Sequence, residues 1–223
     1  MSDDVRRELS DGFAPQGRGV DVTTEDAREA APPAELGEDG GRARAAAAAG
    51  GSSAAAVSVR PATSVDAPGV AAVLNSAILG GSPTLLDTPF SAEDERIYIE
   101  GLPPRSFVHV AELPGAGIVG FQTVIPWSDF ATTAHDHVAT MGTYVDAAHR
   151  HEGVGAALAR ASFAAALALG YEKIFTDLRA DNLASLAYHL ALGFTVVGAA
   201  RRQARTAGGD VDVLFVERFL KEG

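Results

Sequence analysis

The stretch "HRHEGVGAAL", residues 149–158, places two glycines one residue apart where an apolar, strand-like segment meets an alanine-rich helical pattern. Glycine has no Cβ, so such a pair lets the main chain turn tightly and lets a ligand approach the amides. The first N–H groups of a helix have no partner within it, and the helix dipole adds positive potential there. The pattern is therefore typical of an anion-binding turn, at which Arg150 could pair with an anionic oxygen.

Two common phosphate-binding motifs do not fit this turn. A nucleotide P-loop ends in Gly-Lys-Ser/Thr, whereas "EGVGAA" has neither a lysine nor a hydroxyl at that place. A dinucleotide fingerprint needs three glycines and a later acidic residue, and "HEGVGAA" lacks the leading glycine. A glycine-relieved turn without a ligand is the remaining structural alternative.

The turn lies within an alternation of strand-like and helix-like segments. Apolar residues at a period of two predict strands, and a period of 3.6 predicts helices. The patterns predict strands at residues 57–63, 106–113, 117–127, 137–146, 171–179, 194–200 and 211–220, and helices at 64–78, 91–101, 153–169 and 182–192. This order predicts an α+β domain.

Capping residues support these assignments. Ser64 and Ser91 are expected N-caps, and Gly170 and Gly193 stand where two helices should end. The arginine-rich segment 201–210 is expected to link the last two strands. The apolar stripes should bury Val70, Val73, Leu74 and Ala77 on the first helix, and Val154, Leu158, Ala161, Ala165 and Leu169 on the helix after the glycine turn.

Residues 1–56 differ in character from the rest of the chain. They have almost no periodic apolar pattern and end in the low-complexity run "AAAAAGGSSAAA". Such a segment cannot bury enough apolar area to offset the entropy of ordering it. We expect a disordered tail at 1–56, with a regulatory or partner-binding arm as the alternative, and one folded domain at 57–223.

Composition excludes several classes of protein. The chain has 223 residues and no cysteine, which rules out disulfides, thiolate metal sites and a cysteine nucleophile. A formal net charge of −11 would repel nucleic acid and anionic lipid. The N-terminus lacks the apolar region of a secretory signal, and no apolar run approaches the roughly 18 residues of a membrane span. We therefore expect a cytoplasmic protein without nucleic-acid or membrane partners.

Two motifs together resemble one enzyme superfamily. "RHEGVG", Arg150–Gly155, matches the Arg/Gln-x-x-Gly-x-Gly/Ala pyrophosphate loop of the GNAT superfamily of N-acetyltransferases. "NLASLAYHLALGF", residues 182–194, resembles its second signature, Asn…Ala…Tyr…Gly-Phe. The resemblance covers residues 57–220. It is greatest to the phosphinothricin and methionine-sulfone acetyltransferases, which share features such as "RPAT", "TLLDTPFSAEDE", "PW" and "GGDVDVLF".

The resemblance implies a fold and a co-substrate. We expect a three-layer α+β GNAT fold, with a mixed, mostly antiparallel sheet of six or seven strands and about four helices. The sheet should splay between the strands at 137–146 and 171–179, where the pantetheine arm of acetyl-CoA lies. A homodimer is also implied. We expect no metal site, because His135 and His137 stand one residue apart without a further cluster of ligands. The implied acetyl-CoA contacts are Thr143, Tyr144, Val145, Arg150, His151, Glu152, Gly153, Val154, Gly155, Ala156, Asn182 and Ser185.

Acetyl transfer from a thioester needs a neutral amine, a stabilised oxyanion and a protonated leaving thiolate. Tyr188 is the expected general acid, because a phenol can donate a proton to the departing thiolate. The related acetyltransferases place a glutamate where this chain has Thr140, which cannot act as a base. His137 is the expected base, with His135 and Asp129 as alternatives.

The expected acceptor is the primary amine of a small molecule, an amino acid or an analogue of one. Arginine offers a bidentate fork for a carboxylate. Trp127, Arg201 and Arg202 are the expected acceptor contacts, and Arg205 belongs to the same basic cluster. A protein or peptide amine is the second interpretation, and a non-catalytic acyl-CoA-binding module is the third.

Overall fold

The computed structural model describes residues 57–128 and 132–221. The tail expected at 1–56 and the alternative base Asp129 lie outside these described residues.

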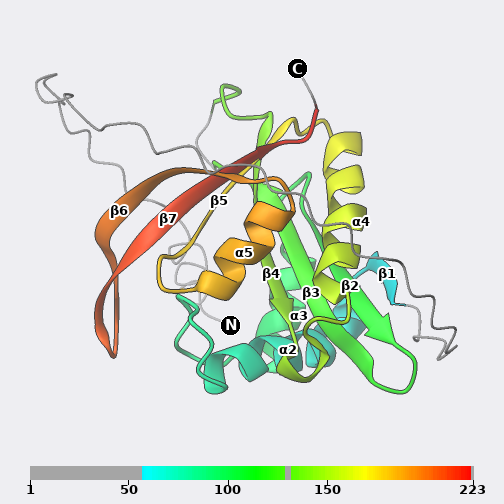
Figure 1. The fold of residues 1–223 in the computed structure, drawn as a ribbon. Coiled ribbons are helices and arrows are strands. Elements are labelled where there is room, and N and C mark those ends of the chain that lie inside the picture. Colours follow the sequence, from blue (N-terminus) through cyan, green and yellow to red (C-terminus); the bar gives the residue numbers. More distant parts are fainter. Residues whose placement is uncertain (1–56, 129–131, 222–223) are drawn as a thin grey trace, which may run out of the picture. The chain divides into compact units, whose positions relative to one another are not determined.

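The described residues form one seven-stranded mixed sheet with the strand order β1-β2-β3-β4-β5-β7-β6 (Figure 1). Only β4 and β5 pair in parallel, and every other neighbouring pair is antiparallel. The strands are β1 Ser58–Pro61, β2 Phe107–Leu113, β3 Gly117–Pro126, β4 Val138–Val145, β5 Lys173–Arg179, β6 Thr195–Thr206 and β7 Gly209–Phe219.

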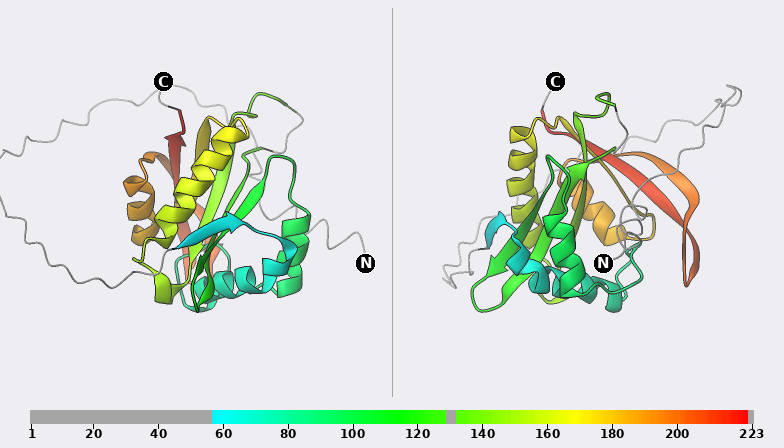
Figure 2. Two further views of the ribbon diagram at one scale, coloured as in Figure 1. Left: turned by 90° about the vertical axis from the view of Figure 1, so that its right-hand side faces the viewer. Right: turned by 180° about the vertical axis from the view of Figure 1, so that it is seen from behind.

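Four α-helices in the described part of the chain cover the sheet on both faces (Figure 2). They are α2 Ala67–Leu79, α3 Ala92–Glu100, α4 Val154–Ala168 and α5 Leu183–Ala191, with short 3₁₀ turns η1 Ser64–Asp66 and η2 Ala147–His149. Helices α2 and α3 lie on one face, and α4 and α5 lie on the other. The expected three-layer α+β architecture is confirmed.

Side-chain alternation along β2 divides the core between the two faces. Val108 and Val110 pack with α2, whereas Ala111 and Leu113 pack with α4. His109 points to the α4 side, where its Nδ1 lies 2.9 Å from the Ser162 hydroxyl. A polar pair is tolerated in this layer because each group satisfies the other.

The parallel pairing of β4 and β5 is very short. Only Val138 with Lys173 and Ala139 with Ile174 are paired. One further link follows, since the Thr176 hydroxyl donates to the main-chain oxygen of Met141 at 2.9 Å. On its other edge β4 remains paired with β3 up to Val145. The two strands therefore separate after a short shared stretch, which is the expected splay.

The start of α2 and the buried stripe of α4 differ from expectation. Ser64 is not the cap: Thr63 caps the 3₁₀ turn η1, where Asp66 accepts the Thr63 main-chain N–H at 2.8 Å, and Asp66 is the N-cap of α2. The stripe on α2 is buried as expected. On α4, however, Leu169 is exposed beyond the helix end and Ala161 and Ala165 are only half-buried, because the buried row runs one residue away from the predicted stripe and includes a serine. That row is Val154, Leu158, Ala159, Ser162 and Ala166.

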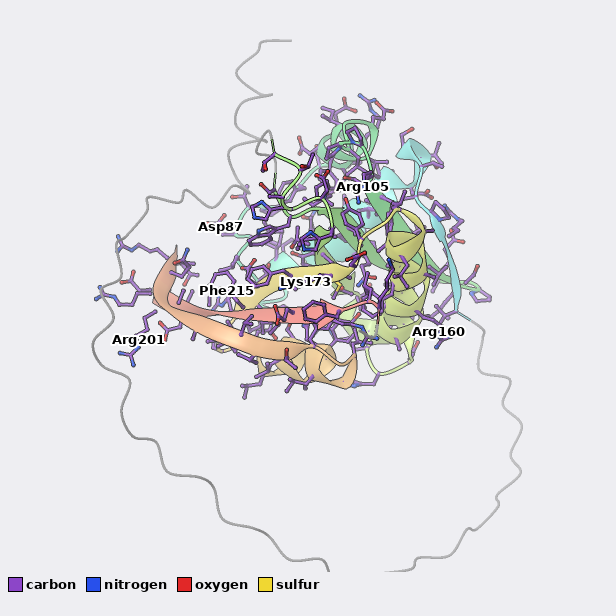
Figure 3. All side chains as sticks on the ribbon, turned by 90° about the horizontal axis from the view of Figure 1, so that it is seen from above. Asp87, Arg105, Arg160, Lys173, Arg201 and Phe215 are labelled. Atoms are coloured by element: carbon purple, nitrogen blue, oxygen red, sulfur yellow. The ribbon has the colours of Figure 1, made fainter. Side chains whose placement is uncertain are left out.

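The arginine-rich segment is strand rather than link. Strand β6 continues through Arg201 and Arg202 to Thr206, and it bulges between Ala200 and Ala204. Figure 3 shows Arg201 on this outermost strand of the sheet. The sequence did not predict a strand here, because charged residues replace the apolar alternation where both faces of β6 are exposed.

A buried carboxylate ties the first elements together. Arg60 on β1 makes two hydrogen bonds of 2.8 and 2.7 Å to Asp66 and one of 2.6 Å to Glu112 on β2. Asp66 is only 6% exposed. The Arg60 guanidinium and the Thr63 N–H hold the pKa of Asp66 at about 2.

Asp66→Asn should therefore lower the free energy of unfolding at pH 7 by about 1–2 kcal/mol. The folded-state pKa lies below the unfolded value, so this contribution is present above about pH 4 and disappears as the pH falls toward 2. Urea unfolding of both proteins across this range measures the difference. Glu112→Gln, at the more exposed partner, is the control and should cost less than about 1 kcal/mol. A pH-independent effect of Asp66→Asn would contradict the assignment.

Candidate active site

The turn that follows β4 reverses the chain through two residues with positive φ. These are His151, with φ 66°, and Gly153, with φ 82°, which is the N-cap of α4. No heavy atom lies within 4 Å of a Cβ built on Gly153. The N–H groups of Val154, Gly155 and Ala156 form the first turn of α4 and lack intrahelical partners. This geometry leaves donors and open space at a positive helix end, which suits a phosphate group.

Gly155 has a different role from Gly153. A Cβ at Gly155 would lie 2.9 Å from Cε2 of Tyr188, so a larger residue would displace that ring. The Tyr188 hydroxyl also donates to the main-chain oxygen of Gly155 at 3.0 Å. The second glycine therefore lets α5 place Tyr188 against the first turn of α4.

The charged residues of the turn are partly paired with one another. Glu152 lies 3.2 Å from Nδ1 of His149. Arg150 donates to the Ser82 hydroxyl at 2.9 Å and so contacts the loop after α2. His151 and Glu152 are exposed. The turn and the loop after α2 therefore meet beside the start of α4.

A buried polar cluster on β3 and β4 lies beside Tyr188. Gln122 on β3 is fully buried and donates to the Thr143 hydroxyl at 2.7 Å. Among the described residues, Oε1 of Gln122 has no hydrogen-bond partner. Burial raises the pKa of Tyr188, while hydrogen bonding to Thr143 and Gln122 opposes that rise. The phenol therefore stays protonated in neutral solution and can act as a proton donor.

Asn182 caps α5. Its side-chain oxygen accepts the Ser185 N–H at 3.0 Å, and its amide nitrogen donates to the main-chain oxygen of Pro83 at 2.8 Å. Both ends of the side chain are thus used within the protein. Asn182 joins the start of α5 to the loop after α2, which is the same loop that Arg150 contacts.

The opposite face of the sheet carries a second polar group of residues. Tyr144 on β4 stacks on Phe121 with ring centroids 5.1 Å apart. The Tyr98 hydroxyl on α3 lies 2.7 Å from the Thr123 hydroxyl on β3. These contacts bring α3 over the part of β4 that has separated from β5.

Glu95, which precedes Tyr98 by one turn of α3, is 5% exposed. Burial raises its pKa to about 7, with a smaller contribution from the Asp94 charge. Its own charge in turn helps to raise the pKa values of Tyr98 and Tyr144. Asp177 on β5 also contributes to the raised pKa of Tyr144, and burial raises the pKa of Asp177 itself.

Glu95 and Gln122 are site residues that were not predicted from the sequence. Glu95 stands in the acidic first turn of its helix, yet its spacing to Ile99 and Leu102 puts it on the apolar stripe of that helix. Gln122 lies in a run of buried strand residues and shares a face of β3 with the buried Val124. Both signals are polar residues at positions where the pattern predicts apolar ones.

Trp127 and His137 lie at the far end of the splayed strands from Thr143. Trp127 packs edge-on against Phe175 at 4.5 Å between ring centroids, and Phe175 stacks on Phe215. His137 is exposed at the start of β4, and its main-chain oxygen accepts the N–H groups of Glu172 and Lys173. Thr143 follows His137 by six positions, which is about 20 Å along an extended strand. The structure does not bring His137 together with Tyr188.

The described residues contain no group of three or more His, Cys, Asp or Glu side chains that could hold a metal ion. Within the same residues, no helix is long and apolar enough to cross a membrane.

The model of the acetyltransferase (GNAT) family matches residues 79–194, more than half of the chain. The chain belongs to this family. The GNAT match spans β4, the glycine turn, α4, β5 and α5, which are the elements that place Tyr188 beside the turn. The expected enzyme class, N-acetyltransferase, and the family's co-substrate, acetyl-CoA, are confirmed.

The similarity to curated GNAT relatives extends over most of the length of those proteins. The chain is 28% identical over 162 residues to phosphinothricin N-acetyltransferase of Streptomyces viridochromogenes, covering 73% of this chain and 87% of that protein. It is 24% identical to an L-methionine sulfoximine/L-methionine sulfone acetyltransferase of Pseudomonas aeruginosa, covering 73% and 94%. It is 22% identical to an L-amino acid N-acyltransferase of Escherichia coli, covering 74% and 95%. The expected resemblance to the phosphinothricin and methionine-sulfone group is confirmed.

Solved structures support the fold. A phosphinothricin acetyltransferase of Sinorhizobium meliloti in complex with acetyl-CoA has a TM-score of 0.68 and 23% identity, covering 75% of this chain and 90% of that one. A ribosomal-protein-alanine N-acetyltransferase of Brucella melitensis has a TM-score of 0.66 and 25% identity, covering 72% and 98%.

The contact between Gly155 and Tyr188 can be tested by a double-mutant cycle. Gly155→Ala should lower the free energy of unfolding by about 1–3 kcal/mol, because the new methyl group overlaps the Tyr188 ring. In a Tyr188→Ala background, the same substitution should lower the free energy of unfolding by much less, because the ring that the methyl group would overlap is absent. Chemical denaturation of the four proteins gives the coupling energy. If the two substitutions lowered the free energy of unfolding additively, the contact between Gly155 and Tyr188 would be contradicted.

Proposed function

We propose that this chain transfers the acetyl group of acetyl-CoA to the primary amine of a small molecule, an amino acid or an analogue of one. The observation that carries the proposal is the placement of Tyr188 against the glycine turn at the start of α4. The acceptor class is supported by the curated relatives, whose names all specify amino acids or their analogues.

The residues present fit acetyl-CoA. The start of α4 offers main-chain donors for a diphosphate, and the left-handed Gly153 leaves the approach open. The remaining proposed diphosphate contacts are Arg150, His151, Glu152, Val154, Gly155 and Ala156. The edge of β4 at Thr143, Tyr144 and Val145 would hold the pantetheine arm by main-chain hydrogen bonds, as an added strand is held. Asn182 and Ser185 flank the same region from α5.

Acetyl-CoA supplies an activated thioester at this place. The main chain of β4 would stabilise the negative charge that develops on the thioester oxygen as the amine attacks. Tyr188 would donate its phenolic proton to the departing sulfur. Because burial raises the pKa of Tyr188, the proton is present throughout the neutral range.

A carboxylate on the acceptor would need a cationic partner. Arg201 and Arg202 are the proposed partners, and Trp127 the proposed apolar contact. Arg202 and Arg205 both bind Asp210, at 2.9 and 2.8 Å. Among the described residues Arg201 has no such ion pair, so it is the cation most available to a ligand.

A protein or peptide amine is the second candidate acceptor, which the similarity to the ribosomal-protein-alanine N-acetyltransferase of Brucella melitensis favours. A homodimer and a cytoplasmic location are further proposals. Sedimentation of the purified chain tests the first, and cell fractionation tests the second.

The deciding experiment measures the release of free thiol from acetyl-CoA with a panel of amino acids, polyamines, aminoglycosides and peptides. Turnover with amino acids or their analogues supports the proposed function. Turnover with peptides alone would indicate that the acceptor is a protein or peptide amine. Saturable binding of acetyl-CoA without turnover of any amine would indicate a binding module instead.

Tyr188→Phe keeps the ring and its packing but removes the transferable proton. kcat should fall by about 10²-fold, while the affinity for acetyl-CoA changes little, because the lost interaction forms mainly in the transition state. Steady-state kinetics and a thermal-shift titration with acetyl-CoA measure the two quantities. Wild-type turnover in the variant would show that solvent protonates the thiolate.

Arg201→Ala should raise KM about tenfold for a carboxylate-bearing amine and leave KM unchanged for its carboxamide. Arg205→Ala is the matched control, since Asp210 already pairs that exposed side chain. Steady-state kinetics with both amines measures the difference. Equal effects of Arg201→Ala on the two amines would exclude a carboxylate contact.

A further inference from the structure

We propose that Glu95 is the general base that removes a proton from the acceptor amine. The inference rests on the proposed acetyl transfer and assigns the proton acceptor of that reaction. It begins from the position of a buried carboxylate on α3 that no other part of the mechanism uses.

The contacts of α3 place Glu95 over the separated part of β4. Tyr98, one helical turn later, bonds the Thr123 hydroxyl at 2.7 Å. Thr123 pairs with Gly142 on β4. Glu95 is also close enough to Tyr144 for its charge to help raise the pKa of that phenol. The hydrogen bond from Tyr98 to β3 and the effect of the Glu95 charge on Tyr144 thus place the carboxylate on the α3 side of the strand that would bind the thioester.

Strand β4 itself supplies no proton acceptor on this face. Alternation along the strand puts Thr140 and Gly142 on the same side as Tyr144. A threonine hydroxyl, a glycine and a protonated phenol cannot take a proton from an amine in neutral solution. A carboxylate from another element is therefore required if the protein supplies the base.

The surroundings of Glu95 suit this role. The side chain is 5% exposed, and among the described residues it has no hydrogen-bond or ion-pair partner. The titratable groups around it are Asp94 and Tyr98 on its own helix and Tyr144 on β4, with Asp177 on β5 beyond Tyr144. An uncompensated buried carboxylate is costly, and an incoming ammonium group would offset that cost.

Burial also tunes the proton affinity. A pKa of about 7 allows Glu95 to be ionised in a large fraction of molecules at neutral pH and still to accept a proton readily. The carboxylate fraction increases as the pH passes upward through this value. The rate should therefore increase over the same interval.

The proton and electron balance of the step is simple. Glu95 takes one proton from the bound ammonium group, and the freed nitrogen lone pair forms the bond to the acetyl carbon. The carbon–sulfur bond then breaks, and its electron pair stays on sulfur, which takes the Tyr188 proton. The second amine proton returns to the Tyr188 oxygen through water, and Glu95 releases its proton to solvent.

The test compares Glu95→Gln with Glu93→Gln, an exposed position on the same helix. At saturating amine, Glu95→Gln should lower kcat by about 10²-fold and abolish the increase of kcat with pH near 7. Glu93→Gln should retain both. Because Glu95→Gln removes a buried charge, the melting temperature and its increase with acetyl-CoA should be at least those of the wild type.

Asp177→Asn is the competing variant, because Asp177 also lies near Tyr144. Loss of the pH-dependent increase in Asp177→Asn but not in Glu95→Gln would overturn the assignment of Glu95. Wild-type kcat and pH profile in Glu95→Gln would likewise overturn it while leaving acetyl transfer intact. Absence of turnover by the wild-type enzyme with every amine would overturn the proposed function and this inference together.

Discussion

The parallel contact between β4 and β5 spans only two residue pairs, and the arrangement of the site depends on how early it ends. The connection through α4 brings β5 next to β4, and the long pairing of β5 with β7 then holds β5 on a diverging course. From Gly142 onward, β4 is paired along one edge only. A strand edge offers main-chain donors and acceptors that a ligand can use. If β4 stayed paired with β5, these main-chain groups would be hydrogen-bonded within the sheet and a ligand could not use them.

The glycine turn and α5 depend on each other through Tyr188. Gly155 leaves room for the ring, and its main-chain oxygen accepts a hydrogen bond from the hydroxyl, while Thr143 and Gln122 interact with the same phenol from the sheet. The loop after α2 contacts both Arg150 and Asn182, so it links the turn to the start of α5. A ligand bound at the turn would therefore contact elements that also orient the proposed proton donor.

Local signals in the sequence predicted most of the fold but only part of the site. The helix-end residues Ser91, Gly170 and Gly193 are strong signals because each satisfies a specific backbone requirement, and the structure has all three. The extension of β6 through Arg201 could not be predicted, because its pairing with β7 overrides a charged sequence. The burial of Glu95 depends on long-range packing of α3 against the sheet, which composition alone does not reveal.

The two proposed proton-transfer groups lie on opposite faces of the sheet. Tyr188 approaches β4 from the α5 side, and Glu95 approaches it from the α3 side. Burial acts on both in the same direction, because it disfavours the charged form of an acid and raises its pKa. For the phenol this keeps the proton available to a leaving group. For the carboxyl it creates a base whose proton affinity matches neutral solution. Burial thus has different consequences for two side chains of different intrinsic acidity: across β4 it makes Tyr188 the proposed acid and Glu95 the proposed base.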